Sequence, residues 1–396
     1  MKLFNLIKNN AACGIPWISA DIDLKEKTIK PCCKYGEHYQ ITESIDEHWY
    51  GEKFNTLRTD WLENRHHAMC YKCDVPIETF SYKKFRYPTM LATSQQMDLD
   101  LATDPIPKPR ILKITTGNIC NLACRMCSPS SSTKMTELIK KSQWLSTMYN
   151  TNTTSRLNDL SWLDGVFENA QNITLLGGEP FYDPIIKDIL YRIKKESIHK
   201  QITITTSTNM MFSTPKFLEL IKELDFKFTF NVSIDGPEMI NNYVRHLSDL
   251  STIIDNSVNL LSQFPNSMTM NVNVTINALN VGYPYETVEV INSWNSRLQK
   301  ELGKKIDYVM SSPVYEPDYM HPGVLPQSVK DFYLKKFESQ HADIRISGSS
   351  EYINTCKHLL KEDCSQHTDT FKKYIDEYDA VADTDYKKIY PEFNWS

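Results

Sequence analysis

Glycine is scarce in this chain, with 12 residues among 396, against about 7% in an average protein. Apolar runs are short, and none reaches the ~18 residues of a bilayer-spanning helix. The N-terminus turns polar after Ile7, too early for a secretory signal. Lys and Arg (44) do not outnumber Asp and Glu (49), which argues against binding nucleic acid through excess positive charge. We therefore expect a cytoplasmic globular protein that has neither a membrane nor nucleic acid as partner.

A chain of this length predicts two to three domains. Prolines at positions 105, 107 and 109 suggest a linker, because proline cannot continue a helix or a central strand. A rhythm of strands and helices begins at residue 110, and the segment after residue 326 has helical periodicity throughout. We expect four parts: a cysteine-rich module at 1–80, a linker at 81–109, an α/β domain at 110–326 and a helical C-terminal extension at 327–396.

The α/β part contains six short β-branched runs separated by longer amphipathic segments. This alternation is typical of βα units with a parallel sheet. Six strands are two fewer than a complete barrel needs, so the pattern predicts a partial (β/α)6 TIM barrel. The predicted strands are 111–116, 172–177, 202–207, 228–234, 270–276 and 305–310.

The ten cysteines are clustered, and Cys120, Cys124 and Cys127 form a C-x3-C-x2-C motif directly after the first predicted barrel strand. Three thiolates in eight residues can surround one small inorganic core, as they do in iron–sulfur proteins. A 4Fe–4S cluster held by three ligands keeps one iron open. A zinc knuckle needs a fourth close ligand, which is missing nearby, and a chance spacing is the remaining alternative.

This motif resembles the hallmark of the radical S-adenosylmethionine (SAM) enzymes, which carry it in the loop after the first barrel strand. Met126 stands where the commonest version has an aromatic residue. The resemblance implies that SAM chelates the open iron through its amino and carboxylate groups. It also implies one-electron reduction, by an external donor such as flavodoxin or ferredoxin, and a 5′-deoxyadenosyl radical that abstracts hydrogen from a substrate.

Further segments agree with the resemblance. The four residues Gly177, Gly178, Glu179 and Pro180 follow the second strand, where family members have a GGEP segment that contacts SAM's amino group. Glycines let a backbone approach a ligand closely, and a carboxylate can accept from an ammonium.

Three later strands supply the other SAM contacts that the resemblance implies. Ser207 and Asn209, with Thr208 between them, are expected at the ribose, and Asn277 is a weaker candidate. Ser233 and Arg245 match a pair that helps to hold SAM's carboxylate, although a surface ion pair is the alternative for Arg245.

The N-terminal part contains Cys13, Cys32, Cys70 and Cys73, enough thiolates to close a site. It resembles the SPASM/Twitch module, which binds an auxiliary 4Fe–4S cluster, although the module usually follows the barrel. We expect Cys32 rather than Cys33 to be the ligand, because neighbouring strand residues face opposite sides. A four-cysteine zinc site and plain buried thiols remain open alternatives.

Two features near the C-terminus complete the candidates. The loop after the sixth strand is expected at the C-terminal mouth of the barrel, so four of its residues are candidates for substrate contact. Cys356 and Cys364 are expected to share one face of a helix as small buried residues. The four loop residues are Glu316, Asp318, Tyr319 and His321.

The sequence thus predicts a radical SAM enzyme that oxidatively modifies a peptide or protein, with the auxiliary cluster as electron acceptor. A small alcohol or sugar is the second choice of substrate. The alternative from another class is a non-catalytic zinc- or iron–sulfur-binding protein on the same scaffold.

Overall fold

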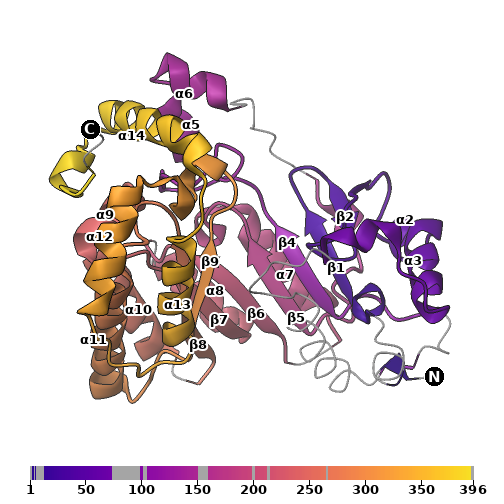
Figure 1. Ribbon diagram of the computed structural model, residues 1–396. Coiled ribbons are helices and arrows are strands. Elements are labelled where there is room, and N and C mark those ends of the chain that lie inside the picture. The colour runs from indigo at the N-terminus through magenta and orange to yellow at the C-terminus, as the bar shows by residue number, and fades with distance from the viewer. Residues whose placement is uncertain are drawn as a thin grey trace. The chain divides into compact units, whose positions relative to one another are not determined.

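The structure is a computed structural model that describes residues 2–3, 5, 13–73, 99–100, 105–149, 159–198, 201–211, 215–264 and 266–393, without the side chains of 72, 73 and 215–217. Most of the predicted linker and the side chain of Cys73 lie outside this description. The chain divides into two units (Figure 1). Unit 1 comprises Met1–Gly117, Ser155–Leu176 and Ile185–Ile204, and unit 2 comprises Asn118–Thr154, Gly177–Pro184 and Thr205–Ser396.

In the described residues of unit 1, five strands follow one another in the order β3-β2-β1-β4-β5. Strand β1 pairs antiparallel with β2 but parallel with β4, and β4 pairs parallel with β5. The strand β1 of the cysteine-rich segment therefore continues the parallel sheet that begins after the predicted linker. The bounds are β1 Ser19–Asp23, β2 Thr28–Lys30, β3 Tyr39–Gln40, β4 Ile111–Thr115 and β5 Asn172–Leu176.

The N-terminal helices of unit 1 pack around an aromatic core. Trp49 and Phe54 are fully buried. Arg58 lies over the Trp49 ring at 4.6 Å and donates to the carbonyls of Trp49 and Pro16. Three α-helices of this unit lie in its described residues, α2 Asp46–Trp49, α3 Glu52–Leu62 and α7 Ile185–Glu196.

Three parallel strands are described in unit 2, β7 Lys227–Ser233, β8 Met268–Ile276 and β9 Val309–Pro313. Every second residue of β8 is a buried methionine, valine or isoleucine, the period of two that a strand requires. Strand β6 Thr203–Thr208 crosses the division between the units.

Nine helices of unit 2 are described. The part expected to be helical after residue 326 contains three of them, and the longest described helix, α11, ends at Gly303 with a left-handed φ of 63°. Among the described residues no helix is long and apolar enough to cross a membrane. The bounds are α5 Thr133–Ile139, α6 Gln143–Met148, α8 Pro215–Leu224, α9 Glu238–Val244, α10 Leu250–Gln263, α11 Pro284–Leu302, α12 Gln327–Glu338, α13 Ser349–Leu359 and α14 Thr368–Ala382.

The predicted barrel strands agree with β4 to β8 to within two residues, but the last one is wrong by about four. The sequence predicted a strand at 305–310, and β9 is Val309–Pro313. The backbone N–H of Ile306 donates to the Asn295 side chain of helix α11 at 2.8 Å, which withdraws this residue from the sheet. The α/β class with a parallel sheet is confirmed.

Candidate active site

Cys120, Cys124 and Cys127 lie in the loop between β4 and α5, as the spacing predicted. Cys120 and Cys124 are buried, and Cys127 is partly exposed. The thiols pack in one cluster with three apolar side chains. These are Leu122, Met126 and Met211.

The backbone of this cysteine loop is held by the segment that follows α9. The N–H of Ala123 donates to the carbonyl of His246 at 3.1 Å, and that of Arg125 donates to Val244 at 2.9 Å. On the other side, the Ser132 hydroxyl donates to the Leu122 carbonyl and accepts from Met135 N–H at the start of α5. The loop is thus attached at both ends to regular structure.

Burial raises the pKa of all three thiols because a thiolate loses hydration there. The pKa of Cys120 rises to about 11, and those of Cys124 and Cys127 rise as well. Arg245 opposes this shift at Cys124 and Cys127. The thiols are therefore protonated at neutral pH, and metal binding has to release their protons.

The donor set fits an iron–sulfur cluster. In the described part of the chain, no three His, Cys, Asp or Glu side chains are arranged to hold a single metal ion. Cluster thiolates each bind a different iron atom, so they stand farther apart than ligands of one ion. Three packed thiols on one loop with no fourth protein ligand match the cluster pattern better than the closed tetrahedron of structural zinc.

Glu179 is buried next to the loop, at 1% exposure. Its backbone N–H donates to the Ile119 carbonyl at 2.9 Å. Its carboxylate accepts from the Thr208 hydroxyl at 2.8 Å and from the Asn209 N–H at 2.6 Å. Burial raises the pKa of Glu179 to about 7, although these hydrogen bonds and Arg245 favour the charged form. A cationic ligand would restore the charge.

Gly178 brings the second strand end against the cysteine loop. A Cβ atom at this position would lie 2.5 Å from the carbonyl oxygen of Ile119, a distance that no side chain can occupy. Two backbones meet there, so the glycine is required by close approach. Gly177 is partly buried and Pro180 is buried beside it.

Asn209 joins the end of β6 to the cysteine loop. Its Nδ2 donates to the Asn121 Oδ1 at 2.8 Å and faces the Cys120 sulfur at 3.9 Å. Thr208 is buried and its hydroxyl donates to Glu179, whereas Ser207 is partly exposed. In the described structure Asn209 therefore supports the cysteine loop, and its ribose contact stays a prediction.

Arg245 ends helix α9, is 8% exposed and forms an ion pair with Asp235, from its Nε to Oδ2 at 2.8 Å. Asp235 is fully buried, so the surface ion pair considered for Arg245 is wrong: the pair is internal. Ser233 is buried two residues before Asp235, at the end of β7. The Asn277 side chain forms local turn hydrogen bonds: its Nδ2 donates to the Thr275 carbonyl, and its Oδ1 accepts from the Leu279 N–H.

Asp235 was missed by the sequence reasoning. Its Oδ1 accepts from the Thr275 N–H at 2.7 Å, so it joins the ends of β7 and β8 while it pairs with Arg245. An Asp-Gly dipeptide directly after a buried strand was the available signal. Arg125 was missed too, because an arginine inside a cysteine motif gives no sign that it is buried.

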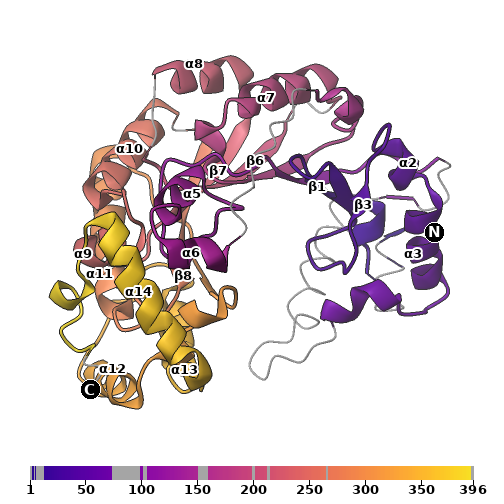
Figure 2. The same cartoon turned by 90° about the horizontal axis from the view of Figure 1, so that it is seen from above.

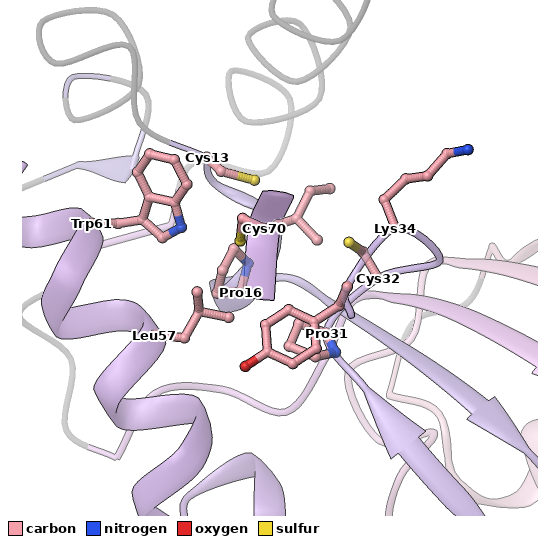
Figure 3. Close-up of a pocket in the computed structure, with 10 residues that line it drawn as sticks. Cys13, Pro16, Pro31, Cys32, Lys34, Leu57, Trp61 and Cys70 are labelled. Atoms are coloured by element: carbon pink, nitrogen blue, oxygen red, sulfur yellow. The ribbon is translucent and has the colours of Figure 1, made fainter. Parts of the chain in front are cut away.

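Three of the N-terminal cysteines surround one pocket of unit 1 (Figure 3). Cys13 is buried, and Cys32 and Cys70 are partly exposed. Cys33 is exposed and does not line this pocket. Apolar side chains complete the wall, among them Leu57 and Trp61 of helix α3. The fourth expected ligand, Cys73, has its side chain outside the described residues.

The loop after β9 divides into exposed and buried candidates. Glu316 and Asp318 are exposed, whereas Tyr319 and His321 are buried. The Tyr319 hydroxyl bonds that of Tyr149. The His321 Nδ1 accepts from the Gly323 N–H at 3.0 Å, so the two buried side chains have internal partners. Substrate contact at this loop remains a prediction.

The prediction that Cys356 and Cys364 share a helix face is wrong. Helix α13 contains Cys356 but ends at Leu359, and Cys364 lies in the turn before the next short helix. Cys356 is fully buried, as expected for a small apolar residue. The Cys364 sulfur is instead 3.4 Å from His321 Nδ1.

Comparison with known proteins agrees with this geometry. Residues 114–281 match the model of the Radical SAM superfamily. No match was found among curated proteins.

Two solved structures with some likeness are SuiB from Streptococcus suis bound to the precursor peptide SuiA and anSMEcpe with bound AdoMet. The first has 14% identity and a TM-score of 0.40 over 67% of this chain and 53% of its own. The second has 18% identity and a TM-score of 0.36 over 60% and 63%. The chain thus spans between about half and less than two thirds of their lengths.

Proposed function

We propose that this protein is a radical SAM enzyme, with Cys120, Cys124 and Cys127 as the ligands of its 4Fe–4S cluster. The observation that carries the proposal is that the cysteine loop, Glu179 and Arg245 lie close together within unit 2. The backbone N–H of Glu179 donates to the carbonyl of the loop residue Ile119. The positive charge of Arg245 lowers the pKa of Cys124, Cys127 and Glu179. When bound, the cluster supplies the electron that cleaves SAM to methionine and a 5′-deoxyadenosyl radical.

The two charged side chains suit the two ends of an amino acid moiety. Burial raises the pKa of Glu179 by removing water from its carboxylate. A nearby amino group would therefore stabilise the charged form of this side chain. Arg245 uses its Nε edge on Asp235. A guanidinium has five N–H donors in a planar fork, so its terminal nitrogens can still bind a carboxylate. Each group would then orient one end of SAM at the open iron.

We infer that the N-terminal pocket holds an auxiliary 4Fe–4S cluster on Cys13, Cys32, Cys70 and Cys73. Three of these thiols line one pocket, and a fourth lies three residues after Cys70 in the sequence. Four thiolates close a cluster completely, which fits an electron acceptor better than a site for SAM. A four-cysteine zinc site would use the same ligands, and metal analysis separates the two.

The substrate is proposed to be a peptide or protein, with net oxidation of a side chain. The support is the Ser233 and Arg245 pair, which resembles that of the peptide-modifying branch. A small alcohol or sugar is the second choice. The electron would come from an external donor such as flavodoxin or ferredoxin.

The test is anaerobic purification, reconstitution and reduction with dithionite in the presence of SAM. We expect a brown protein that releases 5′-deoxyadenosine and methionine in equal amounts. The Cys124→Ala variant, which removes one ligand, should release neither. A colourless protein that contains zinc, or an iron-loaded protein that returns only intact SAM, would overturn the proposal.

A further inference from the structure

Arg125 lies inside the cysteine motif, one residue after Cys124, and has no exposed surface. Its Nη2 is 2.6 Å from Asp379 Oδ1, a residue of helix α14 that is 254 positions away in the sequence. The guanidinium lies over two tyrosine rings, 3.5 Å from the centroid of Tyr243 and 4.5 Å from that of Tyr378. A charge from the cysteine loop is thus enclosed by the C-terminal extension.

Asp379 collects four donors. Its carboxylate accepts from the Arg125 guanidinium and from the hydroxyls of Tyr243 and Thr384, at 2.9 and 2.6 Å. It also accepts from the backbone N–H of Tyr386 at 2.6 Å. A buried carboxylate with all its lone pairs satisfied holds each donor in one direction, because any shift loses bonds that water cannot replace.

Helix α14 also binds the backbone of the loop. The Tyr374 hydroxyl donates to the carbonyl of Arg125 at 2.7 Å, and the Tyr378 hydroxyl donates to that of Ala123. Both tyrosines are fully buried. The carbonyls on either side of Cys124 are therefore attached to α14, while the N–H groups of the same two residues are attached to the end of α9. Figures 1 and 2 show α14 beside α5 and α6, which follow the loop.

We propose that helix α14 positions the cysteine loop and that Asp379, acting through Arg125, is a positioning residue for the SAM-binding cluster. Cys124 lies between the two residues whose backbones α14 holds, so its thiol direction depends on them. The pair need not exist for stability alone, since apolar residues of similar volume often replace a buried ion pair without loss. In addition to stability, the pair fixes the direction in which the Cys124 thiol points. This inference rests on the proposed function.

The test compares two variants of the reconstituted protein. Asp379→Asn keeps the shape but removes the charge that faces Arg125. Asp376→Asn makes the same change on an exposed residue of the same helix and is the matched control. Amide hydrogen exchange, read by mass spectrometry on a peptide spanning 118–131, reports local opening of the loop. Iron content, the KM for SAM and the change that SAM causes in the EPR spectrum of the reduced cluster are measured on the same samples.

We expect the protected amides of this peptide, which include those of Ala123 and Arg125, to exchange at least tenfold faster in Asp379→Asn than in wild type or Asp376→Asn. Iron per chain should stay the same, while the KM for SAM rises several-fold and the SAM-dependent EPR change shrinks. If Asp379→Asn does not fold, Tyr378→Phe, which removes only the hydroxyl on the Ala123 carbonyl, should give the same changes at smaller size.

Wild-type exchange in the loop together with an unchanged KM would overturn the inference, even if the melting temperature fell, because the pair would then act in packing alone. Failure of the proposed function looks different. In that case wild-type protein does not cleave SAM, and the exchange comparison still decides whether α14 holds the loop.

Discussion

In the protein without cluster or SAM, replacing Glu179 by glutamine should make the free energy of unfolding depend less on pH. Burial raises the pKa of Glu179 from 4.5 to about 7, so the folded chain holds a proton on this group that the unfolded chain has lost between those two pH values. Stability falls with rising pH wherever the folded state binds more protons. The loss therefore begins above pH 4.5 and is complete above pH 7.

The size of the effect follows from linkage. With a pKa of 4.5 in the unfolded chain and about 7 in the folded one, ionisation of this group costs about 1 kcal/mol at pH 5.5 and about 3 kcal/mol at pH 8. Glu179 alone should thus lower the free energy of unfolding by about 2 kcal/mol between the two pH values. Glutamine has no such term.

Glutamine is a close replacement because it can keep both hydrogen bonds. Its carbonyl oxygen can accept from the Asn209 N–H, and its amide can donate to the Thr208 hydroxyl, which is both donor and acceptor. Urea unfolding of both proteins at pH 5.5 and pH 8, with a chelator and reduced thiols, measures the difference. If the two proteins lose the same free energy between these pH values, Glu179 is not desolvated and the reasoning fails. In reconstituted protein the variant should bind SAM more weakly, by about 1.5–3 kcal/mol, the scale of a hydrogen bond to a charged group.

Three further changes test other parts of the site. Arg245→Ala should lower the free energy of unfolding by about 3 kcal/mol, because Asp235 stays buried without its partner, and Asp235→Asn combined with it should recover part of the loss in urea titrations. Gly178→Ala should weaken SAM binding at least tenfold at unchanged iron content, since its Cβ would lie 2.5 Å from the Ile119 carbonyl oxygen, and an unaltered Kd by calorimetry would contradict the close approach. Replacing Cys120, Cys124 and Cys127 together by alanine should leave about 4 irons per chain by elemental analysis; zinc in their place would show that the N-terminal pocket is a structural zinc site.

Motifs that are short in sequence could be predicted well. The three cysteines lie within eight residues of one loop, and Gly178 with Glu179 directly follows a strand. Residues of one loop are brought together by their spacing in the sequence. Residues that follow different parallel strands are brought together because the ends of such strands lie at one edge of the sheet. The β-branched run at 270–276 and the helical periodicity after residue 326 are equally local, and the structure has a strand and helices there.

Boundaries set by tertiary contacts could not be predicted. The residues before β9 look like strand, yet Asn295 of helix α11 takes the Ile306 N–H. Cys356 and Cys364 fit one helical face, but the chain leaves the helix after Leu359, and the N–H of Cys364 donates to the carbonyl of Gly323. In each case a distant partner outweighs the local preference, which is worth only a few tenths of a kcal/mol per residue.

The buried ion pairs show the limit most clearly. Asp235 and Arg245 are ten residues apart, and Arg125 and Asp379 are separated by 254 positions. In a sequence each of these charges looks like a solvated surface residue, since charged side chains are rarely buried alone. Each of these charges can be buried only when its partner lies beside it. Neither segment alone therefore shows in its sequence that its charge is buried. Both pairs adjoin the cysteine loop: Arg245 lowers the pKa of Cys124 and Cys127, and Arg125 is itself a residue of the loop. The sequence therefore shows the three cysteines of the loop, but not the buried charges that lie beside them.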